Sequence, residues 1–236
     1  MNIMLPVFKK NEESKYEFIS TKEFILCLAL FLGTTIFIPA LIYAVYKPFE
    51  ILIKTNIYLI FALLINVYII YYVCCKKRNK TFFEGLFIIQ KSKDVYLKSF
   101  FVGILMPILT APLLITLAPS EFPGNKLNPQ MIGIIIASAL IIPVFEEIFF
   151  RGFLFPFFES KINSFWSIVF VGIIFGISHA PNVDNVGVVI ALFIFYSFII
   201  TLVRYFTKSL IPSLITHMAH NITLIVGWML IVYFKN

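Results

Sequence analysis

Two adjacent carboxylates and three histidines are the residues of this chain whose types and positions could support chemistry. Of its twelve Asp and Glu, only Glu146 and Glu147 lie well inside a long apolar stretch, and all three histidines (His179, His217 and His220) lie inside later ones. A charged group in the middle of a membrane helix costs about 2.5–3.5 kcal/mol. Because the first three apolar stretches hold no comparable residues, this concentration indicates one polar site within residues 146–221.

The segment Ile141–Gly152 reads IIPVFEEIFFRG and contains both carboxylates. Glu147 and Arg151 are four residues apart, so they share a helix face and can pair. Glu146 points about 100° away from Glu147, which leaves it free to face another helix. Pro143 lacks an N–H, so we expect a local kink just before Glu146. An ion pair near a helix end would also explain Glu147 and Arg151, but it leaves Glu146 without a partner.

The apolar segment that follows places one histidine beside a small-residue face. Gly172, Gly176 and Ala180 recur every four residues, a pattern that favours close approach of a second helix. Phe175 and His179 are also four apart and lie on an adjacent face. Taken alone, His179 is explained as well by an interhelical hydrogen bond as by catalysis.

The last apolar segment carries the other two histidines. Ser213, His217 and Asn221 lie one helical turn apart on one face, and His220 flanks that face or points elsewhere. The alternative interpretation is a polar stripe that joins two helices, worth about 0.6 kcal/mol per hydrogen bond in membranes.

Together these side chains are sufficient for amide hydrolysis without a covalent intermediate. Glu146 can accept a proton from a water molecule that His179 helps to orient. His217 and Asn221, on one helix face, can donate hydrogen bonds to the tetrahedral oxyanion. The arginine of the predicted ion pair would hold its glutamate ionised and in place.

Other hydrolytic chemistries fit the sequence less well. There is no HExxH zinc motif, and the two aspartates, Asp94 and Asp184, lie outside the apolar stretches, so no aspartate pair is available. Ser178 lacks the following glycine that the rhomboid serine protease motif requires. We expect no cofactor, although a zinc ion remains an alternative, because glutamate and histidine are adequate zinc ligands. Its ligands would be Glu146, Glu147, His179 and His217.

The elements that position these residues must be membrane helices. The 236 residues are 60% hydrophobic and 13% charged, more apolar surface than a soluble globule of this length could bury. We therefore predict an all-α, polytopic transmembrane bundle of about seven spans with a catalytic cavity inside the membrane. The expected spans cover residues 24–46, 55–75, 99–118, 131–156, 165–182, 187–203 and 209–234.

Charge between the spans predicts orientation. Fifteen of the 19 Lys and Arg fall on the side that includes the N-terminus, so a multi-pass protein of the cell membrane with a cytoplasmic N-terminus is predicted. The net charge of +7 is spread between spans rather than over a folded basic face, so nucleic-acid binding is not expected. The expected organisation is a cytoplasmic segment (1–23), N-terminal helices without an identified motif (24–130), a catalytic core (131–224) and the end of the last span with the C-terminus (225–236).

The core resembles the CAAX-protease and bacteriocin-processing family, also called the Abi family. The segment EEIFFR from Glu146 matches its EExxxR motif, FGISH from Phe175 its FxxxH motif, and HMAHN from His217 its HxxxN motif. The resemblance implies an intramembrane endopeptidase of the glutamate type, a family that was formerly described as metalloproteases. It assigns water activation and oxyanion stabilisation to the residues named above, and active-site support to Glu147 and Arg151.

This resemblance also implies the partners: the lipid bilayer and a membrane-associated peptide or protein substrate. Bacterial relatives are linked to bacteriocin self-immunity, so one alternative is a non-catalytic immunity or scaffold protein. A second alternative is a proton-coupled carrier, since membrane carboxylates and histidines also relay protons. The absence of paired repeats argues against the carrier.

Overall fold

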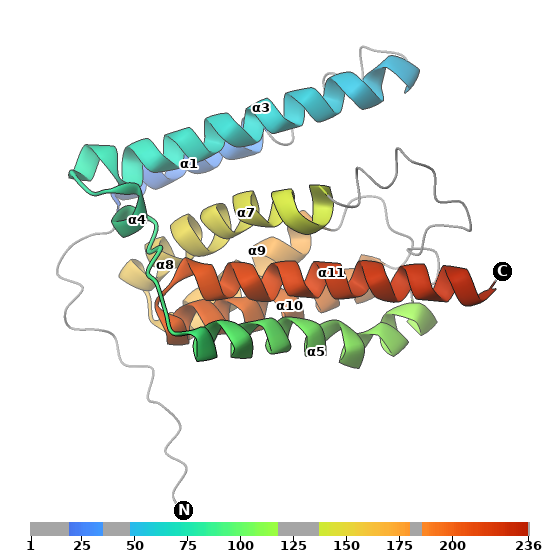
Figure 1. The fold of residues 1–236 in the computed structure, drawn as a ribbon. Coiled ribbons are helices and arrows are strands. Elements are labelled where there is room, and N and C mark those ends of the chain that lie inside the picture. The colour runs from blue at the N-terminus through green and yellow to red at the C-terminus, as the bar shows by residue number, and fades with distance from the viewer. Residues whose placement is uncertain (1–18, 35–47, 118–136, 180–185, 236) are drawn as a thin grey trace, which may run out of the picture. The chain divides into compact units, whose positions relative to one another are not determined.

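The computed structural model describes residues 19–34, 48–117, 137–179 and 186–235, and the regular structure within these ranges is entirely helical (Figure 1). This confirms the all-α prediction. The described residues fall into two compact units, one ending at Leu86 and the other beginning at Phe87. All six candidate residues lie in the second unit.

The first unit is a pair of helices followed by two single turns. Its elements are α1 (Thr21–Leu32), α3 (Pro48–Cys74), the 3₁₀ turn η2 (Lys76–Arg78) and α4 (Phe82–Gly85). The Ser20 hydroxyl caps α1, and Glu23 completes the capping box. Glu23 also forms an ion pair with Lys77 of η2, just after α3, and the hydrogen bonds from Lys77 and Ser20 lower the pKa of Glu23 to about 2. Capping and pairing together hold the start of α1 against the end of α3.

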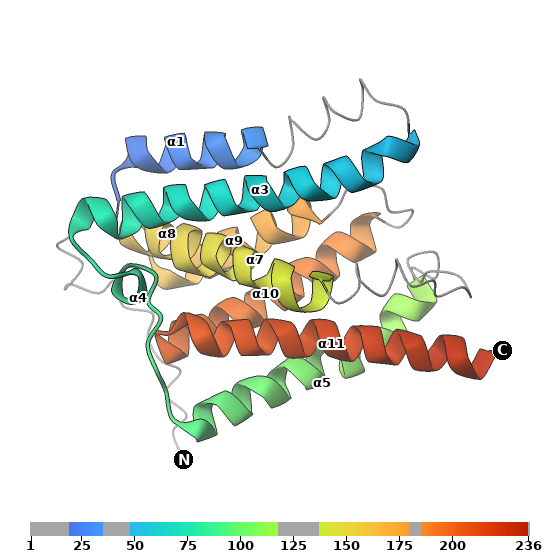
Figure 2. The same ribbon diagram turned by 45° about the horizontal axis from the view of Figure 1, so that its top comes forward.

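The second unit contains the longer helical assembly. Its elements are α5 (Lys93–Leu117), a continuous helical run formed by η4 (Ala137–Ile141), α7 (Ile142–Glu147), η5 (Ile148–Leu154) and α8 (Phe155–Lys161), then α9 (Ser164–Ser178), α10 (Val186–Thr207) and α11 (Leu210–Lys235). Helix α11 packs along α5, and α10 packs against both α9 and α11 (Figures 1 and 2). Helix α7 also contacts α11, and η5 contacts α9. Four segments therefore meet around the candidate residues: the run from η4 to α8, α9, α10 and α11.

The helix that carries the two glutamates is wound more loosely on both sides of them. The segments η4 and η5 are π-helical, and α7 lies between them. Pro143 cannot donate a hydrogen bond to the carbonyl of Ala139, and the wider turn lies at this point. A π-helical turn therefore lies just before Pro143, and the helix continues, while the kink stays a prediction. Such turns are rare and occur frequently at functional sites.

Glycines permit the closest helix contacts in this unit. A Cβ at Gly176 would lie 2.9 Å from the Ile190 carbonyl oxygen of α10, and one at Gly172 would lie 3.4 Å from that of Ile194. This confirms that the Gly172 and Gly176 face admits a second helix, while Ala180 lies outside the described residues. Gly103 plays the same part between α5 and α11, where a Cβ would meet the backbone of Thr216.

Three helices in the described ranges are long and apolar enough to cross a membrane: Lys93–Pro112, Gly187–Thr207 and Leu210–Gly227. The apolar stretch Ser164–Ser178 is shorter, at 15 residues. The chain is thus a membrane protein of helical-bundle type. The expected number of seven spans stays a prediction, because the spans over 24–46, 131–156 and 165–182 reach into residues outside the described ranges.

The glycine contacts give a test with opposite signs at two positions. Gly176→Ala should destabilise the protein by about 1–3 kcal/mol, because the new methyl group overlaps the backbone of α10. Gly227→Ala, where nothing lies within 4 Å, should be neutral or stabilising by up to about 1 kcal/mol through helix propensity. Thermal melting of the two purified variants measures this difference, and equal melting temperatures would show that the close contact does not matter.

Candidate active site

A fully buried ion pair lies at the centre of the candidate site. Arg151 Nη1 donates to Glu147 Oε1 at 2.9 Å, and neither side chain has any exposed surface. The two residues are one turn apart, as their spacing predicted. The guanidinium of Arg151 is directed into the protein interior.

The guanidinium of Arg151 is also bonded to α10. Its Nη2 donates to the Ser197 hydroxyl at 2.8 Å and to the Ser197 carbonyl at 3.2 Å, and its Nε donates to the Thr201 hydroxyl at 3.2 Å. The ring of Phe175 covers one face of the guanidinium, 4.9 Å from Cζ. Charge, hydrogen bonds and ring contact therefore join three helices at one side chain.

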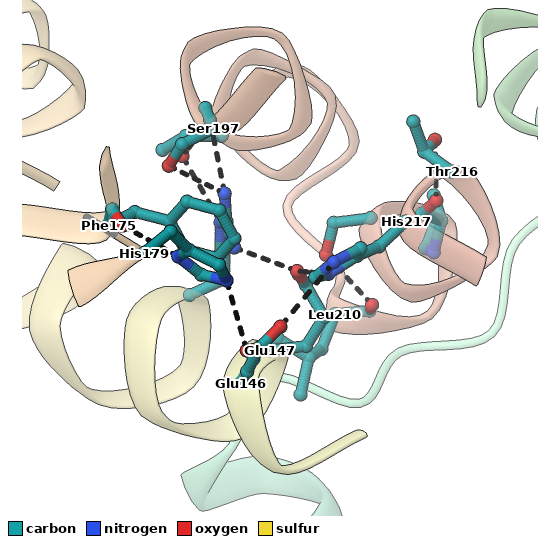
Figure 3. A network of polar contacts seen from close by, with 12 residues as sticks. Glu146, Glu147, Phe175, His179, Ser197, Leu210, Thr216 and His217 are labelled. Carbon is teal, nitrogen blue, oxygen red and sulfur yellow. Dashed lines mark hydrogen bonds and ion pairs between the residues drawn. The ribbon is translucent and has the colours of Figure 1, made fainter. Parts of the chain in front are cut away.

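His217 of α11 lies between the two glutamates (Figure 3). Its Nδ1 is 2.9 Å from Glu147 Oε1, the oxygen that also accepts from Arg151. Its Nε2 is 3.5 Å from Glu146 Oε2. The buried pair thus fixes the ring of His217 so that its other nitrogen faces Glu146.

His179 is placed by the end of α9 rather than by its interior. The helix ends at Ser178, and His179 is the capping residue, with φ −101° and ψ 3°. Its Nδ1 is 2.8 Å from the Phe175 carbonyl oxygen, and its ring stacks between those of Phe175 and Phe193, at 4.3 and 4.4 Å between centroids. The remaining nitrogen, Nε2, lies 3.5 Å from Glu146 Oε1.

Glu146 is thus the point on which two imidazoles from different helices converge. One carboxylate oxygen faces His179 and the other faces His217 (Figure 3). About a fifth of the Glu146 side chain and a quarter of the His179 side chain are exposed, whereas Glu147 is fully buried. The site therefore has an accessible part, formed by Glu146 and His179, and a fully buried part that contains Glu147.

The hydrogen bonds determine where the imidazole protons lie. A carbonyl oxygen only accepts, so His179 Nδ1 carries a proton. The carboxylate of Glu147, ionised beside Arg151, also accepts, so His217 Nδ1 carries one too. In the neutral imidazoles, both Nε2 atoms then present lone pairs to the Glu146 carboxylate.

The other polar residues of α11 occupy different positions. Asn221 is half-buried, one turn after His217. His220 is 2% exposed and packs against the ring of Tyr196, 4.2 Å between centroids, with no hydrogen bond at its Nδ1 among the described residues. It flanks the site rather than joining the contacts around Glu146.

A family model described as Type II CAAX prenyl endopeptidase Rce1-like matches residues 128–223, less than half of the chain. Comparisons with curated proteins and with solved structures gave no match. The region 128–223 is thus similar to type II CAAX prenyl endopeptidases. All six candidate residues lie within it, as do all the ion pairs and hydrogen bonds described around Glu146 and Glu147. The match supports a CAAX-protease-like peptidase that acts in the membrane.

The Rce1-like region includes contacts that the sequence did not single out. Ser197 and Thr201 bind the buried arginine, and Phe193 covers the ring of His179. A serine and a threonine one turn apart in an apolar helix do suggest interhelical hydrogen bonds. Nothing in the sequence distinguishes Phe193 from the many other phenylalanines.

Metal binding was the open alternative for this site. Glutamate and histidine are suitable zinc ligands, but in the part of the chain that the structure describes, no three or more His, Cys, Asp or Glu are grouped so as to hold a metal ion.

The buried ion pair predicts a stability difference between a single and a double variant. Arg151→Met should cost about 3–5 kcal/mol, because it leaves the Glu147 carboxylate buried without its cation. Adding Glu147→Gln removes the unpaired charge and should recover much of this loss, which thermal melting can measure. If the double variant melts no higher than Arg151→Met, the pair does not act as described.

Proposed function

We propose that this protein is an intramembrane endopeptidase in which Glu146 and His179 activate a water molecule to hydrolyse a peptide bond. The observation that carries the proposal is the convergence of two imidazole nitrogens on the two oxygens of one accessible carboxylate. The Rce1-like match supports the reaction class, and the residues 131–224 are proposed as the catalytic core.

The first step requires a base and an oriented nucleophile. A water molecule that is hydrogen-bonded to Glu146 and His179 attacks the substrate carbonyl carbon, and its proton passes to Glu146 as the C–O bond forms. When the tetrahedral intermediate collapses, the C–N bond breaks and the same proton is delivered to the leaving nitrogen. Glu146 therefore acts first as base and then as acid, and it returns to its starting state.

The oxyanion of the intermediate is assigned to His217 and Asn221, which lie one turn apart on α11. Donation from His217 Nε2 requires a proton there as well as on Nδ1, which makes the ring positively charged. The Glu147 carboxylate beside Nδ1 stabilises the positive ring, and Arg151 keeps Glu147 ionised and in place. Glu147 and Arg151 are thus positioning residues that act through His217.

The substrate class follows from the membrane setting of the site. We propose a membrane-associated peptide or protein that enters from the bilayer or its surface, and no metal or other cofactor. The Lys and Arg distribution supports a cytoplasmic N-terminus.

The water-activating assignment is tested by removing one charge without changing shape. Glu146→Gln should abolish cleavage of membrane-peptide substrates by purified protein in proteoliposomes, because an amide cannot accept the proton of water. Glu84→Gln is the control, since glutamine also completes the capping box that Glu84 forms with Thr81 in α4. Full cleavage by Glu146→Gln would refute the proposed base.

The same assay separates the remaining alternatives. Treatment with a zinc chelator should leave the rate of wild-type cleavage unchanged, and loss of activity that zinc restores would favour a metalloprotease. A non-catalytic immunity protein would protect cells against a bacteriocin equally well with Glu146→Gln, whereas a peptidase would lose its protection.

The oxyanion assignment predicts a characteristic kinetic effect. Asn221→Ala should lower kcat by about 10²–10³-fold and change KM little, because the lost hydrogen bond forms only in the transition state. Steady-state kinetics with a cleaved peptide measures both constants. A rise in KM with unchanged kcat would instead place Asn221 in substrate binding.

A further inference from the structure

A second buried arginine in this unit has no acceptor. Arg204, in the last turn of α10, is only 3% exposed. Among the described residues its guanidinium forms neither a hydrogen bond nor an ion pair, and its Nε is fully enclosed. A buried charge is expected to be paired, because desolvation penalises it heavily.

The other buried arginine, Arg151, differs from Arg204 in its acceptors. Its guanidinium donates to a carboxylate, two hydroxyls and a carbonyl oxygen. Ser197, Thr201 and Arg204 follow one another at helical spacing on one face of α10, so the two arginines occupy successive levels of the same interface. Arg151 is bonded to acceptors of the chain, whereas Arg204 has no hydrogen-bond acceptor among the described residues.

The guanidinium of Arg204 is surrounded by aromatic rings. The ring of Phe87 lies 4.7 Å from Cζ and that of Phe155 lies 6.0 Å away, so aromatic rings rather than acceptors cover the guanidinium. Glu159 acts on Arg204 electrostatically but forms no hydrogen bond with it, and its carboxylate is instead contacted by the Ser164 hydroxyl at 2.9 Å and by Lys208 Nζ at 3.8 Å.

The chain segment that carries Phe87 is fastened across this end of the bundle. The amide of Leu210 donates to the Phe87 carbonyl at 2.9 Å, and the Ile89 amide donates to the Ser209 hydroxyl at 3.3 Å. Phe87 has φ 56°, a left-handed conformation that is costly for a bulky residue. The ring of Phe87 is therefore held over the Arg204 guanidinium by a backbone conformation that is itself costly.

We propose that Arg204 binds a phosphate-bearing anion, with Phe87 and Phe155 as the walls of the site and Lys208 as a second cation. A planar guanidinium matches the oxygens of a phosphate group in geometry and charge. The end of α8 and the turn between α10 and α11 come together at this end of the unit, where Lys208 Nζ lies 3.8 Å from Glu159. Clustered cations at helix ends suit the headgroup of an anionic lipid, and inorganic phosphate offers the same chemistry.

The test measures thermal stability of the full chain in phosphatidylcholine vesicles, with and without phosphatidylglycerol. The anionic lipid should raise the melting temperature of the wild type by about 5 °C or more, and Arg204→Met should lose this rise. Lys98→Gln, which removes an exposed charge, should respond as the wild type does. Arg204→Lys, which keeps the charge without the planar fork, should retain part of the rise.

A second comparison uses the two arginines as opposites. In phosphatidylcholine alone, Arg204→Met should melt no lower than the wild type, because it removes an unpaired charge, whereas Arg151→Met should melt far lower. If Arg204→Met melts as low as Arg151→Met, or responds to phosphatidylglycerol as the wild type does, the proposal is overturned.

Added inorganic phosphate identifies the source of the anion. An Arg204-dependent rise with inorganic phosphate in phosphatidylcholine would assign the site to the free anion, and a rise with phosphatidylglycerol alone would assign it to lipid. Native mass spectrometry should then show one more bound phosphatidylglycerol on the wild type than on Arg204→Met. None of these readouts depends on peptidase activity.

Discussion

The cost of burying charge is the constraint on which this structure depends. Glu147 and Arg151 have no exposed surface, so each is tolerable only while the other holds it. The remaining donors of the guanidinium need acceptors as well, and they find them on α10 at Ser197 and Thr201. The hydrogen bonds of Arg151 thereby hold the helical run of α7 and η5 against α10.

The buried ion pair also orients the side chains in the accessible part of the site. Glu147 Oε1 accepts from Arg151 and faces His217 Nδ1, so the ring of His217 has one orientation, with Nε2 toward Glu146. Packing does the equivalent for His179, because the glycine face of α9 brings it against α10, where Phe193 covers the imidazole. An electrostatic support and an aromatic one therefore meet at one carboxylate.

Residue types and spacing went far toward the candidate site. The energetic cost of ionisable groups in apolar helices singled out Glu146 and the histidines, and the four-residue interval predicted the pairing of Glu147 with Arg151. The all-α membrane class followed from the requirement that every backbone polar group in lipid be bonded within its own segment. These inferences rest on local periodicity and composition, which a single sequence contains in full.

Other features could arise only once distant helices were in contact. The place of His179 at the end of α9, the ring of Phe193 and the left-handed Phe87 have no distinct local signal. The sequence by itself determined which side chains are too costly to be incidental and which of them share a helix face. Only the tertiary structure decided which buried charges find acceptors, because an acceptor such as Ser197 is 46 residues from the arginine that it binds. Pairing across that separation depends on how helices pack, and so among the described residues Arg151 is fully bonded whereas Arg204 forms no hydrogen bond.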